Sequence, residues 1–207
     1  MAALFDEILL KGIRSGQAPG RTAAARDWYR QQAKDITRQQ RNRSQGDKLI
    51  NELKSDVERR QDNRFMMGNM YLFAYDSKHK DTLPYYDRFP LIFPINKAKG
   101  GFLGINMHYL PPILRAKLMD ELYKVLNNKN FDETTKLTAS YKVLNSAAKF
   151  KEFRPCIKHY LSAHVRTKPA YINPSEWDIA LFLPTQKFVG ATATQVYADS
   201  RKIAKGR

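Results

Sequence analysis

Residues 69–75 read NMYLFAY, residues 89–95 read FPLIFPI and residues 102–109 read FLGINMHY. All three stretches are rich in aromatic and aliphatic side chains, and turn-forming residues such as Gly100 and Gly101 separate them. Short strands this closely spaced predict an antiparallel meander or a small SH3-like barrel. Pro90 and Pro94 cannot donate ladder hydrogen bonds, so we expect the second strand to lie at a sheet edge or to carry a bulge.

Helical patterns flank these strands on both sides. Apolar spacing predicts helices over residues 4–10, 22–41, 47–60, 113–126, 135–148 and 151–165, and a last strand over residues 180–189. The prediction is an α+β fold: a small SH3-like antiparallel β-barrel or meander with inserted helices, preceded by a basic N-terminal helical arm. The expected division is a basic arm over residues 1–64, an α+β core domain over residues 65–194 and a basic tail over residues 195–207.

The chain is strongly basic, with 36 Lys and Arg against 20 Asp and Glu and a formal charge of +16 over 207 residues. Such a surplus produces a positive field that attracts polyanions, although solubility alone is an alternative explanation. The single cysteine, Cys156, cannot form an internal disulfide. Neither a secretion signal nor a membrane-spanning stretch is recognisable, so we expect a protein that is made soluble and stays soluble.

The positive charge gathers in two regions. Nine basic residues stand against two acidic ones between residues 11 and 43, and eight stand against one over residues 136–168. Neighbouring cations of this kind can neutralise a run of phosphates. In the arm, the predicted contacts to nucleic acid or to an acidic partner are Arg21, Arg26, Arg30, Lys34, Arg38, Arg41 and Arg43. On the predicted helical patch they are Lys149, Lys151, Arg154 and Lys158.

The aromatic residues divide into two groups. Tyr71, Phe73 and Tyr75 alternate along one predicted strand, which favours a single buried face over base stacking. Tyr85 and Tyr86 lie in a proline-containing loop and are the better candidates for an exposed contact to an unpaired base.

The residue types of a catalytic centre are sparse. Asp76, Asp81 and Asp87 gather around the first inter-strand loop, as in a metal-dependent nuclease, but turn formation also explains them. Cys156 and His159 have helical spacing, yet the further ligands of a zinc site are missing. We therefore predict no catalytic residues, no metal site and no cofactor.

Four segments carry a resemblance to a known family. Residues 71–91 read YLFAYDSKHKDTLPYYDRFPL, residues 101–111 GFLGINMHYLP, residues 154–161 RPCIKHYL and residues 176–184 EWDIALFLP. Over residues 65–200 the chain resembles a family of virion proteins of T-even-like contractile-tailed bacteriophages and their cyanophage relatives. The resemblance implies a structural or DNA-associated virion protein. The DNA end protector, which sits on packaged DNA ends, is the first interpretation, and a neck or baseplate subunit is the second.

These observations together predict a non-enzymatic virion protein, made in the host cytoplasm, that binds DNA or acidic neighbouring subunits within a larger assembly and not a membrane. One alternative is a neck, tail or baseplate adaptor without DNA contact, whose basic arms become ordered on assembly. A second alternative is a metal-dependent nuclease that uses Asp76 and Asp87.

Overall fold

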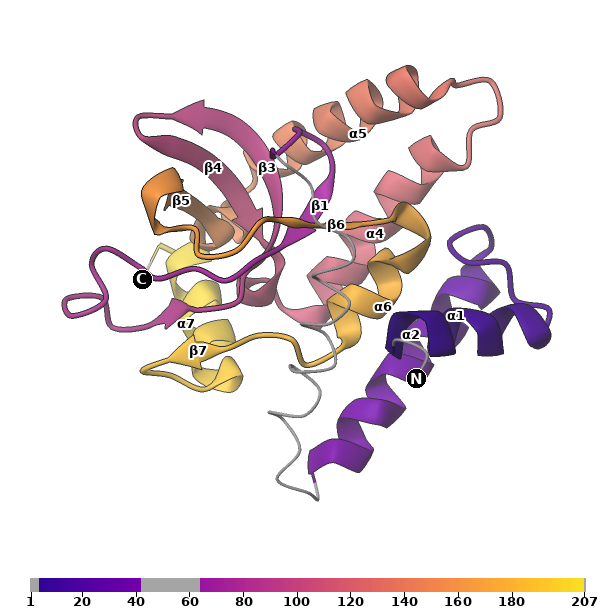
Figure 1. The fold of residues 1–207 in the computed structure, drawn as a ribbon, viewed down its shortest axis with the longest axis horizontal. Helices are drawn as coiled ribbons and strands as arrows, with labels where there is room; N and C mark the ends of the chain where they lie inside the picture. The colour runs from indigo at the N-terminus through magenta and orange to yellow at the C-terminus, as the bar shows by residue number, and fades with distance from the viewer. Residues whose placement is uncertain (1–3, 42–63, 207) are drawn as a thin grey trace.

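The computed structural model describes residues 4–41 and 64–206, and its centre is an antiparallel sheet (Figure 1). The five strands of this sheet, in spatial order, are β5 (Ile157–Leu161), β4 (Gly101–Asn106), β3 (Leu91–Ala98), β1 (Met70–Leu72) and β6 (Ala170–Ile172). Two further strands, β2 (Tyr86–Asp87) and β7 (Phe188–Val189), pair with each other in a separate small sheet.

The predicted α+β class is confirmed, whereas the SH3-like barrel is not found in the described part of the chain. The sheet is open, because the chain after β5 crosses to the far side and pairs β6 with β1 and not with β5. Strands β3, β4 and β5 follow one another as an antiparallel meander. Of the two predicted arrangements, the meander is therefore the one that forms.

Strand β3 lies inside the sheet, between β4 and β1, so an edge position for the second strand was the wrong expectation. The alternative, a bulge, is confirmed: the register with β4 shifts between Pro94 and Asn96. Pro90 precedes the strand and therefore removes no ladder hydrogen bond. The irregularity at Pro94 accommodates the residue that has no N–H to donate.

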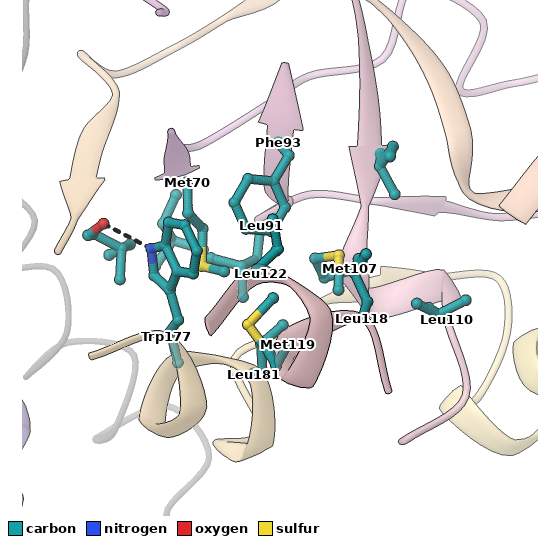
Figure 2. Packing of buried hydrophobic residues seen from close by; sticks show 14 of the residues in the cluster. Met70, Leu91, Phe93, Met107, Leu110, Leu118, Met119, Leu122, Trp177 and Leu181 are labelled. Carbon is teal, nitrogen blue, oxygen red and sulfur yellow. Dashed lines mark hydrogen bonds between the residues drawn. The ribbon is translucent and has the colours of Figure 1, made fainter. Parts of the chain in front are cut away.

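Helices cover one face of the sheet. They are α4 (Pro112–Leu126), α5 (Glu133–Ala147) and α6 (Trp177–Phe182). Figure 2 shows Met70, Leu91 and Phe93 of the sheet packed toward Leu122 and Trp177 of these helices. The indole Nε1 of Trp177 donates to a main-chain oxygen of β6 at 3.0 Å, so the largest core side chain is also hydrogen-bonded.

The other face of the sheet carries a second, aromatic cluster. Tyr71, Phe73, Tyr75, Phe102 and Tyr160 are all buried in it. The alternation of Tyr71, Phe73 and Tyr75 therefore reflects a packed core face, as predicted, and not a stacking platform for bases.

Two predicted elements differ from the observed ones. Residues 151–165, predicted as a helix, form a 3-10 helix over Lys151–Cys156 and then strand β5, because pairing with β4 offers residues 157–161 a full ladder. The strand predicted over 180–189 is reduced to β7, since α6 continues to Phe182. The remaining 3-10 helices cover Met107–Tyr109, Ser162–His164 and Pro174–Glu176.

The N-terminal helices are α1 (Leu4–Arg14) and α2 (Ala23–Arg41); α2 packs beside α6 and α1 packs on α2 (Figure 1). Helix α1 runs past Gly12, where a side chain would overlap the ring of Tyr29 on α2, so the glycine lets the two helices approach closely. The helix predicted over residues 47–60 lies outside the described residues.

Residues assigned to a C-terminal tail form helix α7 (Ala193–Ala204). The hydroxyl of Ser200 donates to the carbonyl oxygen of Tyr109 at 3.0 Å, and the buried Arg115 donates to the hydroxyl of Tyr197 at 2.6 Å. These bonds attach α7 to the body. Among the described helices, none is both long and apolar enough to cross a membrane.

Candidate nucleic-acid interface

Three basic residues of α2 contact the body of the protein. Arg26, Arg30 and Lys34 follow one another at intervals of four and therefore share a helix face. The Nε of Arg30 donates to Oδ1 of Asp178 at 2.8 Å, and its Nη2 donates to Oδ1 of Asp120 at 3.0 Å. Burial alone would lower the pKa of Arg30, but the two carboxylates outweigh it and raise that pKa.

The two neighbours of Arg30 on this face are also engaged. The Nε of Arg26 lies 3.3 Å from Oδ1 of Asp120, and its guanidinium lies over the Tyr123 ring. The ammonium of Lys34 lies 5.4 Å from the centroid of the Phe182 ring, although the residue is exposed. These cations fasten α2 to α4 and α6. We therefore do not assign Arg26 and Arg30 to a phosphate contact.

The other predicted residues of the arm have different positions. Arg21 is exposed just before α2, where Asn127 Nδ2 donates to the neighbouring carbonyl of Gly20 at 2.8 Å. Arg43 lies outside the described residues, as do the side chains of Arg38 and Arg41. Of the contact residues predicted in the arm, Arg21 is the one whose described side chain is exposed and without an ionic or aromatic contact.

The second predicted patch is divided by the change from helix to strand. Lys149, Lys151 and Arg154 are exposed after α5 and along the 3-10 helix, and no carboxylate of the described residues pairs with them. Lys158 is separated from them on β5, where it lies opposite Gly104 of β4. Three of the four predicted cations thus remain together on the surface.

Lys158 lines a cavity of about 460 Å³ between the loop over residues 77–86 and strand β5. Tyr85 and Tyr86, predicted as exposed aromatic contacts, are half-buried in its wall. We call it the tyrosine cavity, and its lining residues are Tyr75, Ser77, Lys78, His79, Leu83, Tyr85, Tyr86, Asp87, Asn106, Tyr109, Lys158, His159, Tyr160 and Leu161.

Aromatic packing fixes one side of the tyrosine cavity. The rings of Tyr85 and Tyr109 lie 6.0 Å apart at 31°, and Phe188 meets Tyr109 edge-on at 5.1 Å. The ammonium of Lys158 lies 4.0 Å from the centroid of the Tyr109 ring, a cation–π contact. Burial lowers the pKa of Lys158.

A buried polar network supports the floor of the tyrosine cavity. Nδ1 of His108 lies 2.7 Å from Oδ2 of Asp87, and Nε2 lies 2.8 Å from the hydroxyl of Thr185. Asn106 Nδ2 donates to Oδ2 of Asp87 at 3.2 Å and to the hydroxyl of Tyr160 at 3.0 Å. The carboxylate can only accept, so His108 carries its proton on Nδ1 and accepts the hydroxyl proton of Thr185.

Asp87, His108 and Thr185 are hydrogen-bonded in the order of a hydrolase triad, but Thr185, in the place of the nucleophile, is only 1% exposed. Burial lowers the pKa of His108 against the pull of Asp87, which keeps the imidazole neutral. The pKa of Asp87 is lowered because its partners, His108 foremost, outweigh the opposing effect of burial. We interpret the network as a brace between β2, the end of β4 and the segment before β7.

The aspartates considered for a nuclease do not converge in the described part of the chain. Asp76 pairs with Lys80 and Arg166 at the surface, whereas Asp87 is buried in the network of His108. No group of three His, Cys, Asp or Glu side chains within residues 4–41 and 64–206 has the arrangement of a metal site.

Sequence reasoning missed several members of the tyrosine cavity. The pattern places Tyr109 on a strand and offers His159 only as a zinc ligand, and nothing in it singles out His79. A signal for part of the cavity was present in the run Lys78, His79 and Lys80, which gathers positive charge beside Tyr85. The approach of β5 to this loop was not readable, because residues 151–165 were predicted as a helix.

The chain is a basic α+β protein whose surface carries a cavity lined by tyrosines and lysines. The family model described as phage T4 terminal DNA protecting protein matches residues 22–205. The chain belongs to this family, and the resemblance to a phage DNA end protector is confirmed. No curated protein and no solved structure matches the chain.

Proposed function

We propose that the protein is a non-enzymatic virion component that binds the ends of linear phage DNA and shields them from exonucleases. The match to the family of terminal DNA protecting proteins over residues 22–205 is the observation that carries this proposal. The charge of +16 supports it, because phosphate neutralisation supplies most sequence-independent affinity for DNA.

The proposed phosphate contacts are cations of the two basic regions other than Arg26 and Arg30. Lys149, Lys151 and Arg154 form the first group, since they are exposed and without acidic partners among the described residues. The second group lies in the N-terminal region and contains Arg21, Lys34, Arg38, Arg41 and Arg43. Arg26 and Arg30 are given the separate role of holding α2 to the body.

The test is digestion of linear duplex DNA by a processive exonuclease, with and without the full-length protein. We expect the protein to slow digestion from the ends and the protection to weaken as salt rises. The triple substitution Lys149→Gln, Lys151→Gln and Arg154→Gln should reduce the salt slope of binding by about 0.9 for each phosphate contact removed. Equal digestion with and without saturating protein at low salt would refute the proposal.

A matched control exists at the other end of α5. Substituting glutamine for Lys124, Lys129 and Lys136 removes the same formal charge around the N-terminal end of that helix, which is 15 residues long. At about 1.5 Å per residue the two sets lie roughly 20 Å apart. We expect the control variant to keep the wild-type salt slope more closely.

Contact with a neighbouring virion subunit is a second candidate, favoured by one observation. Phe150 is 61% exposed and lines a largely apolar groove between α4 and α5. Under this alternative, Phe150→Asp reduces incorporation into particles and leaves protection of naked DNA ends unchanged. Loss of both activities, or of neither, would count against a separate protein contact.

A further inference from the structure

We propose that the tyrosine cavity binds one unpaired terminal nucleotide of the DNA, with the base against its tyrosines and the phosphate at Lys158. This inference rests on the proposed function, because it names the part of a DNA end that the protein holds. It concerns a site separate from the surface cations, and its test is separate as well.

The size of the tyrosine cavity selects the class of ligand. Its volume of about 460 Å³ lies within the range of small-molecule sites, roughly 300–1,000 Å³. A cavity in this range admits one nucleotide but not a base-paired duplex. A DNA end can fill it only with a nucleotide that has left the helix, which is what distinguishes an end from the interior.

The aromatic lining is suited to a base. Tyr85 and Tyr86 are the half-buried rings of the lining, and their positions do not depend on a ligand because Tyr85 packs on the buried Tyr109 and Tyr86 belongs to β2. Bases stack on aromatic rings with little regard to sequence, since every base has a π-face. The expected recognition is therefore general for the four bases.

The charges of the lining favour a phosphate. Lys78 and Lys158 contribute cations, and His79 and His159 contribute further donors. Asp87 is the carboxylate of the lining. Its Oδ2 accepts from His108 and Asn106, and its Oδ1 accepts from the main-chain N–H groups of Phe89 and Lys187. No carboxylate within the described residues pairs with Lys158, so its ammonium is available for an anion.

The back wall is already ordered. The hydroxyl of Tyr75 accepts from the main-chain N–H of Leu161 at 3.2 Å, and the hydroxyl of Tyr160 accepts from Asn106 at 3.0 Å. These bonds leave the two tyrosines as fixed surfaces and leave recognition to the groups nearer the opening. A ligand that enters such a site loses little affinity to ordering the protein.

The test measures the affinity of the full-length protein for short duplexes that differ only at one end, the other being closed by a hairpin. The open end carries an unpaired nucleotide on the 5′ or the 3′ strand, with or without a terminal phosphate, or is itself closed by a hairpin. We expect the phosphorylated unpaired end to bind about tenfold more tightly than the doubly closed duplex. The comparison of the two strands identifies the source of the nucleotide.

Substitutions in the tyrosine cavity should act on this difference alone. Lys158→Gln should lower affinity for the phosphorylated end about tenfold and remove the advantage of the phosphate, with binding to the doubly closed duplex unchanged. Lys78→Gln, at an exposed position that the fold does not need, provides a second variant with a smaller loss of the same kind. Lys149→Gln is the control, which should weaken all duplexes alike.

The failure of this inference is distinguishable from failure of the proposed function. If the wild-type protein protects linear ends but binds open and closed duplexes equally, or if both cavity variants keep the full preference, the cavity does not hold a nucleotide and the proposed function stands. If the protein protects no ends, the proposed function itself is wrong.

Discussion

Arg30 and Asp178 form a buried ion pair that joins helix α2 to helix α6, with 2.8 Å between Nε and Oδ1. The two residues are 148 positions apart in the chain, so the pair attaches the N-terminal helix α2 to a segment near the C-terminal end. A buried pair of this kind does not by itself add much stability, but removal of one partner leaves an uncompensated charge.

Arg30→Ala is expected to lower the free energy of unfolding by about 3–5 kcal/mol, because Asp178 then stays buried without its cation. Urea denaturation monitored by circular dichroism measures the change. Arg21→Ala, at an exposed position, is the control and should shift stability by less than about 0.5 kcal/mol. Equal stability of the two variants would show that the ion pair does not hold α2.

Stability should fall as the pH is lowered below 6.5. The pKa of His108 lies below its usual 6.5 in the folded protein. The unfolded chain therefore binds a proton that the folded chain does not, and the contribution present above pH 6.5 is lost as pH falls toward the folded pKa. The buried groups facing the imidazole are Asp87 and, through its cationic side chain, Arg115. Melting temperatures between pH 8 and pH 5, set at half-unit intervals, measure the slope.

The His108→Gln variant should melt at a lower temperature at pH 7 yet show a shallower dependence on pH, since the titrating group is gone. His159→Gln, at an exposed position, should keep the wild-type slope. An unchanged slope in His108→Gln would assign the pH dependence to other groups.

Cys156 should be unreactive in the folded protein. Burial raises the pKa of its thiol to about 12, so the reactive thiolate is scarce at pH 8, and the side chain is inaccessible. A chromogenic disulfide reagent should therefore react completely with Cys156 in denaturant. Without denaturant, it should react only as fast as the protein unfolds. Rapid stoichiometric labelling of the native protein would contradict the buried position.

Gly101→Ala should destabilise the meander and weaken the wall of the tyrosine cavity. A Cβ at Gly101 would overlap the carbonyl oxygen of Tyr160, and backbone on β5 cannot move aside as a flexible side chain would. We expect a loss of about 1–3 kcal/mol in urea denaturation. Lys99→Ala in the same turn should change little, and equal effects of both substitutions would rule out the packing explanation.

The local sequence pattern predicts those elements whose tertiary contacts favour the same secondary structure as their own apolar spacing. The helices α4 and α5 follow from apolar spacing and from the capping Asp132, whose side chain accepts from the N–H of Thr135 at 2.7 Å. Strand β5 did not follow, because Ile157 and Leu161 are four positions apart and fit a helix equally well. Pairing with β4, which local sequence does not reveal, decided that segment.

Local sequence is equally unable to predict which charged residues of the candidate site pair with one another. The basic face of α2 could be read from the spacing of Arg26, Arg30 and Lys34, but their acidic partners lie far along the chain, Asp120 being 90 positions from Arg30. Tyr85, Tyr86 and Lys158 were found separately, and their convergence on one cavity required the tertiary fold.

On the basic face of α2, a polyanion would compete with two carboxylates for Arg30. A polyanion that takes hold of Arg30 must first separate it from Asp178 and Asp120, leaving two anions directed at the newcomer. Binding of Arg30 to a nucleic acid and its pairing with Asp178 are therefore mutually exclusive, and the folded chain attracts a polyanion at Arg30 less strongly than a count of its arginines indicates.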